Sequence, residues 1–180
     1  SNAFEWDTDG QNNLDRFKTT ATVSNFTVLG PALDGNSMSG NYKYGTDLRR
    51  NVAASLYNSV VVGFPTAIRM NQSSVFPNYQ NEIGQIANNV YYGKTTAIVS
   101  GNSEVAASDI AEYLKANDNI VEAGNDFQTT AAYEALGLKA DMFFGKRLNT
   151  GYPASPNFAV TSGTLATGAK FDYARFNEEN

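Results

Sequence analysis

The sequence predicts an all-β fold, a parallel β-helix of about four coils with a helical insertion between the third and fourth coils. Four short segments, each rich in β-branched or aromatic residues, end in glycine, as strands followed by turns do. The first three of these glycines are Gly30, Gly63 and Gly93, and the tripeptide Thr-Ala-Ile follows the second and third at the same offset. Such nearly even spacing, with a strand in every copy, indicates stacked coils.

The four expected strands lie in Asn25–Gly30, Asn58–Gly63, Asn88–Gly93 and Ala140–Gly145. Residues one and three positions before each glycine share one face of a strand, and we expect them to stack from coil to coil. The residues two positions before each glycine are apolar too, so the strands are either buried on both faces or carry a neighbouring segment on one face. An asparagine begins each of the first three segments, and these side chains form either an amide ladder or separate turn caps.

Helical patterns fill residues 103–137, between the third and fourth expected strands. Ser103 or Ser108 can cap the first helix, and the second covers Phe127–Leu136. Residues 81–87 fit a short helical turn. We interpret these helices as additions that pack on the sides of the coils or cover an open end.

The domain organisation follows from the same pattern. Residues 1–3 have the appearance of an expression-tag scar, and residues 4–180 are expected to form one domain, the C-terminal part of a larger protein. Residues 156–180 are expected to cap the last coil, because an open sheet edge must be covered. No apolar run approaches the roughly 20 residues of a membrane span, so no transmembrane segment is predicted.

Two missing residue types exclude much chemistry. The chain has no histidine and no cysteine, which rules out Ser–His–Asp and Cys–His nucleophiles, thiolate zinc sites and disulfides. Catalysis would have to use carboxylates, Arg, Lys, Tyr or hydroxyl groups. With a net charge of −5 and no basic patch, the chain is not expected to bind nucleic acid. Only 17% of residues are charged, and such a polar, uncharged surface suits an extracellular protein.

Three stretches, Thr22–Pro31, Leu48–Asn51 and Leu56–Ile68, resemble a set of large exported proteins of Gram-negative gut and marine bacteria. These are uncharacterised lipoproteins or cell-surface proteins of the pectate-lyase-like type. Residues 156–169 are similar to the segment that closes many such proteins, although Thr164-Leu165 stands where the usual form has Ser-Pro. The resemblance implies a right-handed parallel β-helix, and a location that is secreted or at the cell surface. Anchoring in the outer membrane is implied if the native N-terminus carries a lipid signal.

A loose calcium motif is the first candidate site. Asp7, Asp9 and Asp15 surround a glycine-containing turn, and calcium prefers several oxygen ligands from a flexible loop. The spacing departs from the EF-hand pattern. A solvated acidic turn is the alternative interpretation. No other cofactor is expected.

Asp47, Arg49 and Arg50 form the densest charge cluster on an expected strand. Some β-helix polysaccharide lyases pair Asp-bound calcium with an Arg base, and this chemistry needs no histidine. It does need several carboxylates beside the Arg, and an ordinary Arg stays protonated. The alternative is a surface ion pair.

Tyr42 and Tyr44 lie in a glycine-flanked loop, where exposed rings can stack on the apolar faces of sugars. The alternative is packing within the chain. Together these features predict a surface-exposed structural or binding module, with a polysaccharide or cell-surface glycan as the candidate partner. A polysaccharide lyase or glycoside hydrolase is the less favoured alternative. Three or more carboxylates converging with an Arg in a groove would favour that enzyme.

Overall fold

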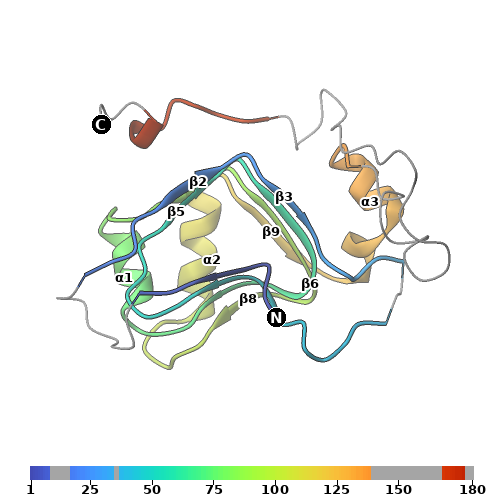
Figure 1. The fold of residues 1–180 in the computed structure, drawn as a ribbon, viewed down its shortest axis with the longest axis horizontal. Helices are drawn as coiled ribbons and strands as arrows, with labels where there is room; N and C mark the ends of the chain where they lie inside the picture. The colour runs from blue at the N-terminus through green and yellow to red at the C-terminus, as the bar shows by residue number, and fades with distance from the viewer. Residues whose placement is uncertain (9–16, 35–36, 139–167, 177–180) are drawn as a thin grey trace.

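The computed structural model describes residues 1–8, 17–34, 37–138 and 168–176. Parallel strands form two sheets, and helices lie beside them (Figure 1). The strands are β1 (Phe4–Trp6), β2 (Thr22–Ser24), β3 (Thr27–Leu29), β4 (Tyr44–Leu48), β5 (Ser55–Tyr57), β6 (Val60–Met70), β7 (Ile86–Ala87), β8 (Val90–Ser100) and β9 (Ile120–Ala123). The helices are α1 (Val75–Gln80), α2 (Ala107–Ala116) and α3 (Thr130–Ala135), with 3₁₀ turns η1 (Asn125–Gln128) and η4 (Ala174–Phe176).

The predicted all-β, right-handed parallel β-helix is wrong. The fold is α/β, about 21% helical and 33% strand, and not a sheet-only solenoid. The physical reason lies in the connections: α1 lies between β6 and β7, and α2 lies between β8 and β9. Both helices bury apolar side chains in the main core, so they are part of the scaffold and not additions to it. Because α1 is less than two turns long, its sequence is too short for a helical period to be recognised.

The strand pairing predicted for the first three repeat segments is confirmed. β3, β6 and β8 pair in parallel, with Val60 opposite Thr27 on one side and Val90 on the other. Further along, Thr66 pairs with Thr96, which is the offset seen between the two Thr-Ala-Ile copies in the sequence. β4 pairs with this second half of β6, and β1 pairs with β4. The smaller sheet has the order β2-β5-β7.

The fourth strand of the stack differs from the expectation. β9 pairs with β8. The two residues before it, Asp118 and Asn119, occupy the positions that Asn88 and Asn89 hold before β8. The segment predicted for this place, Ala140–Gly145, lies outside the described residues, as does most of the predicted cap. Glu122 replaces the apolar residue of the other copies and Ala123 replaces their closing glycine, which hid this strand in the sequence.

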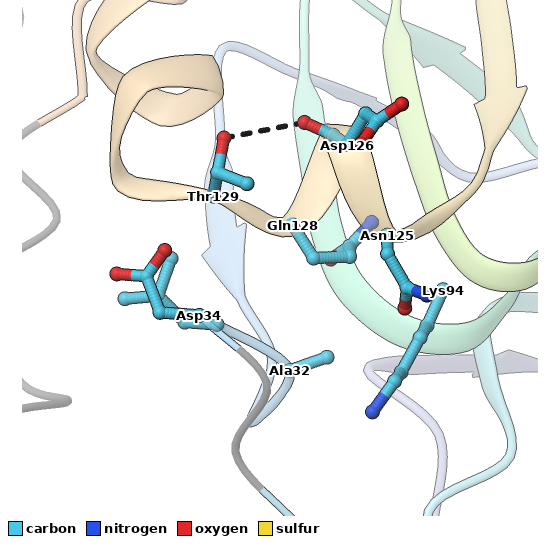
Figure 2. A pocket seen from close by; sticks show the side chains of 8 residues that line it. Ala32, Asp34, Lys94, Asn125, Asp126, Gln128 and Thr129 are labelled. Atoms are coloured by element: carbon cyan, nitrogen blue, oxygen red, sulfur yellow. Dashed lines mark hydrogen bonds between the residues drawn. The ribbon is translucent and has the colours of Figure 1, made fainter.

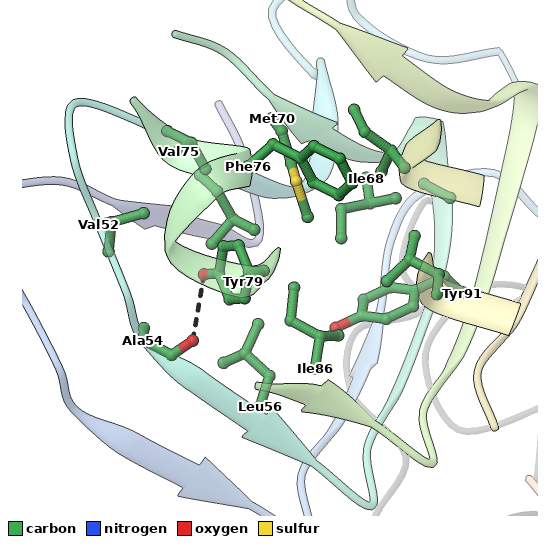
Figure 3. Close-up of a cluster of buried hydrophobic side chains, with 14 of the residues drawn as sticks. Val52, Ala54, Leu56, Ile68, Met70, Val75, Phe76, Tyr79, Ile86 and Tyr91 are labelled. Carbon is green, nitrogen blue, oxygen red and sulfur yellow. Dashed lines mark hydrogen bonds between the residues drawn. The ribbon is translucent and has the colours of Figure 1, made fainter. Parts of the chain in front are cut away.

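Two cores confirm that the stacked strands are buried on both faces. In the main core, Val61 and Tyr91 pack with side chains from β5, α1 and α2 (Figure 3). On the opposite face, Val60, Val62 and Val90 pack against α3. Neighbouring residues in a strand point to opposite sides, which is why a continuous apolar run serves both cores.

The repeat glycines permit close contact between stacked backbones. A Cβ atom on Gly30 would lie 2.6 Å from the carbonyl carbon of Gly63 and would overlap the carbonyl oxygen. Gly63 itself has a positive φ of 85°. Any side chain at Gly30 would therefore push the first two layers apart.

The asparagine columns act both as turns and as a ladder. Asn25, Asn58 and Asn88 all have φ between 53° and 59°, a conformation that asparagine tolerates. The amide of Asn88 also donates to Asn58 Oδ1 at 2.8 Å. A second, buried column follows them, in which Asn89 Oδ1 accepts from the Ser59 N–H at 3.0 Å. Neither of the two interpretations of the sequence was therefore sufficient alone.

Helices near the sheets are short or amphipathic. Among the described residues, none is both long and apolar enough to span a bilayer.

Candidate functional site

A charged cluster lies across β1, β4 and β6. Glu5, Asp47 and Arg69 are partners in adjacent strands, on the face turned away from the main core. Arg69 donates from Nε to Asp47 Oδ1 at 2.8 Å and from Nη2 to Oδ2 at 2.6 Å. The Asp47 side chain is only 2% exposed, so this is a buried bidentate ion pair.

Arginine also pairs with the two remaining carboxylates of this cluster. Arg50 Nη1 lies 2.7 Å from Asp7 Oδ2, and Arg49 donates to Glu5 Oε1. The structure thus gathers three carboxylates and three guanidinium groups, as the enzyme alternative requires. Each carboxylate, however, is already neutralised by a guanidinium.

The pKa of Arg69 bears on that alternative. Burial lowers it, but the hydrogen bond and the negative charge of Asp47 outweigh burial, so the pKa is raised above its ordinary value. A guanidinium with a raised pKa cannot accept a proton as a general base. The charged cluster therefore fits a structural role, in which ion pairs link adjacent strands, better than a catalytic one.

The two tyrosines predicted to bind a ligand contact other side chains of the chain. The guanidinium of Arg69 lies 4.0 Å from the centre of the Tyr44 ring and donates to its hydroxyl at 3.0 Å. Tyr42 packs edge-on against Phe64, with ring centres 6.5 Å apart, and contacts the main core. Both rings thus make the contacts that the packing alternative predicts, and their role in binding stays a prediction.

The predicted calcium motif is only partly described. Asp7 pairs with Arg50, while Asp9 and Asp15 lie outside the described residues. Within the described ranges, no group of three or more acidic, histidine or cysteine side chains is arranged to hold a metal ion.

A concave site lies away from the charged cluster, and we call it the tyrosine cavity. It has a volume of about 600 Å³ and lies between the turn after α1, the end of α2 and the C-terminal segment 168–176. Tyr79, Tyr113 and Tyr173 contribute rings to its wall. Its polar lining consists of the amides Gln80, Gln85 and Asn117, the carboxylates Glu82 and Asp172, and Arg175.

Hydrogen bonds fix the orientation of two amides in the tyrosine cavity, Gln85 and Asn117. Gln85 accepts from the Tyr57 hydroxyl at 2.9 Å and donates to Asn117 Oδ1 at 3.3 Å. Asn117 ends α2 and donates back to the Tyr113 carbonyl at 2.9 Å. These side chains therefore keep one orientation before any ligand arrives.

The phenols of the cavity stay protonated at neutral pH. Burial raises the pKa of Tyr113 to about 12, although the hydrogen bond that its oxygen accepts from the Ile86 N–H opposes this. Burial also raises the pKa of Tyr173. Both phenols therefore stay uncharged at neutral pH.

Repeat asparagines hold the C-terminal segment in place. Asn58 accepts from the Lys170 N–H at 2.9 Å and donates to the Lys170 carbonyl at 2.8 Å. Asn88 donates to the Gly168 carbonyl at 2.9 Å. Arg175 donates to the carbonyls of Glu82, at 3.2 Å, and Ile83. The segment therefore lies over the stacked turns that contain Asn58 and Asn88, beside β2 and β5 (Figure 1). It forms one wall of the cavity.

A second cavity of about 320 Å³ lies between the segment after β3 and η1. Asp34 accepts two hydrogen bonds from Thr130, of which the side-chain bond contributes most to lowering the pKa of Asp34. Lys94 extends away from Asp126 in this cavity (Figure 2). The charged groups therefore do not converge on a common point.

No protein-family model, curated protein or solved structure gives a significant match to this chain. Arg69, Gln85, Asn117 and Tyr173 were all missed by sequence reasoning. Arg69 lies on a different strand from its partner, and the cavity joins the middle of the chain to its C-terminal segment, so no local pattern marked Arg69 or the cavity.

Proposed function

We propose that the chain is a surface-exposed binding module and that an uncharged glycan occupies the tyrosine cavity. The observation that carries the proposal is the combination of two partly exposed tyrosine rings with three amides around one cavity. Sugar hydroxyls both donate and accept hydrogen bonds, and a side-chain amide can accept through its oxygen and donate through its nitrogen. The apolar faces of sugars pack on tyrosine rings, whose hydroxyls add a polar contact.

Charge favours a neutral glycan over an acidic one. Glu82 and Asp172 accept hydrogen bonds and repel anionic sugars, while the Arg175 guanidinium already donates to two backbone carbonyls. A net charge of −5 also disfavours nucleic acid. A secreted or cell-surface location, as in the exported proteins that the sequence resembles, is part of this proposal.

The test is isothermal titration with neutral and acidic oligosaccharides. Asp172→Asn and Gln80→Ala change exposed side chains of the cavity, and we expect each to weaken binding about fivefold, the effect of one lost hydrogen bond. Asp109→Asn, an exposed carboxylate on α2 outside the cavity, is the matched control. Binding of acidic sugars alone, or equal affinities in all variants, would contradict the proposal. Chromatography of the same mixtures for cleaved sugars tests the enzyme alternative.

A further inference from the structure

A row of aromatic rings continues from the tyrosine cavity into solvent. Tyr173 lies on the cavity wall, and its ring centre is 6.2 Å from that of Phe176. Phe176 is followed by Phe171 at 5.7 Å. Tyr57 lies under the first two rings, with ring centres at 4.9 and 5.0 Å. The row therefore rests on a fully buried ring, and its outer members Phe176 and Phe171 lie outside the lining of the cavity.

The outermost ring is unusually exposed. Phe171 is 58% exposed and is one of three large apolar side chains with high exposure among the described residues. A second one, Ile83, adjoins the same segment, because its carbonyl accepts from Arg175. Apolar surface that stays in water next to a cavity commonly belongs to a binding site.

The hydrogen bonds of the segment hold Phe171 in position. The neighbouring Lys170 is bound through both its backbone groups to Asn58, and its ammonium lies 2.8 Å from Asp118. The ring is consequently presented on an anchored segment, which lowers the entropy lost when a ligand packs on it.

We propose that the ligand of the tyrosine cavity is a glycan chain of several units, which leaves the cavity along Tyr173, Phe176 and Phe171. This inference rests on the proposed function and specifies its ligand. The ring spacing is comparable to the length of one pyranose unit, so successive sugars can each meet an aromatic side chain. One aromatic contact strengthens binding about fivefold.

The experiment is a chain-length series by isothermal titration. The probes are cello-, xylo- and manno-oligosaccharides of one to six units. For the series that binds, we expect affinity to rise with length and to gain about fivefold on reaching Phe171. Phe171→Ala should remove that gain and leave the affinity of the shorter sugars unchanged. Asp172→Asn should weaken all lengths equally, and Phe17→Ala, which changes a side chain 91% exposed, should alter none.

The outcomes separate the two proposals. Equal affinity for short and long chains, or a length gain that persists in Phe171→Ala, overturns the chain-binding inference while the cavity remains a glycan site. Failure of all three series and of other neutral glycans overturns the proposed function and the inference with it.

Discussion

Replacing Arg69 with methionine leaves the Asp47 carboxylate buried without its guanidinium partner. Removing one member of a buried ion pair costs about 3–5 kcal/mol, since the remaining charge stays desolvated. Arg69 is 20% exposed, and Asn2 Nδ2 still lies 3.3 Å from Asp47 Oδ2. We therefore expect the lower end, about 3 kcal/mol, which corresponds to a fall in Tm of about 6–12 °C for a chain of this size.

The measurement is urea unfolding followed by tyrosine and tryptophan fluorescence, with thermal unfolding in parallel. In the double variant Asp47→Val with Arg69→Met, no charge is left unpaired, and stability should return to within about 1 kcal/mol of the parent. Lys170→Met, which breaks an exposed ion pair with Asp118, should leave Tm unchanged. A loss below about 1 kcal/mol in Arg69→Met would refute the burial argument, because exposed pairs contribute only that much.

Three further predictions concern the stacked layers and the cavity. Asn89→Ala should cost about 3 kcal/mol in urea unfolding, because it leaves the buried Ser59 N–H without its acceptor and removes hydrogen bonds to two carbonyls; Asn25→Gly, at φ 59°, should be neutral. Gly30→Ala should lower stability by about 2 kcal/mol or more, since its Cβ meets the Gly63 carbonyl, and an unchanged urea midpoint would contradict that contact. Because the pKa of Tyr113 is about 12, above the ordinary 10.0, stability should fall by about 1.4 kcal/mol per pH unit between these values. Tyr113→Phe should flatten this slope in unfolding titrations from pH 9 to 12, whatever its effect at neutral pH.

The repeat was readable because its causes are local. A short apolar run and a closing glycine mark each of β3, β6 and β8, and equal offsets between copies become pairing registers, as Thr66 and Thr96 illustrate. The fold class was misjudged because the return segments between strands are short. The brief α1 shows no distinctive signal. The cap predicted for the next helix was wrong, because Ala106, and not Ser103 or Ser108, occupies the N-cap of α2 and forms no side-chain cap hydrogen bond.

Candidate sites were less predictable. The cluster around Asp47 was found from its dense charges, yet its main partner Arg69 comes from another strand and appears in no local motif. Tyr113 and Tyr173, which line the tyrosine cavity, were not singled out in the sequence. Tyr113 and Tyr173 are far apart in the chain, and only the docking of segment 168–176 brings them to the same cavity.

By itself the sequence determined that parallel strands stack at a regular spacing, that both faces of these strands carry apolar side chains, and that histidine and cysteine chemistry is absent. Local side-chain pattern and composition decide these properties directly. The tertiary structure alone decided that helices complete the core, that arginines neutralise the carboxylates, and that a cavity forms beside Tyr113. These features depend on contacts between residues far apart in sequence, and such contacts form only when the strands and helices pack together.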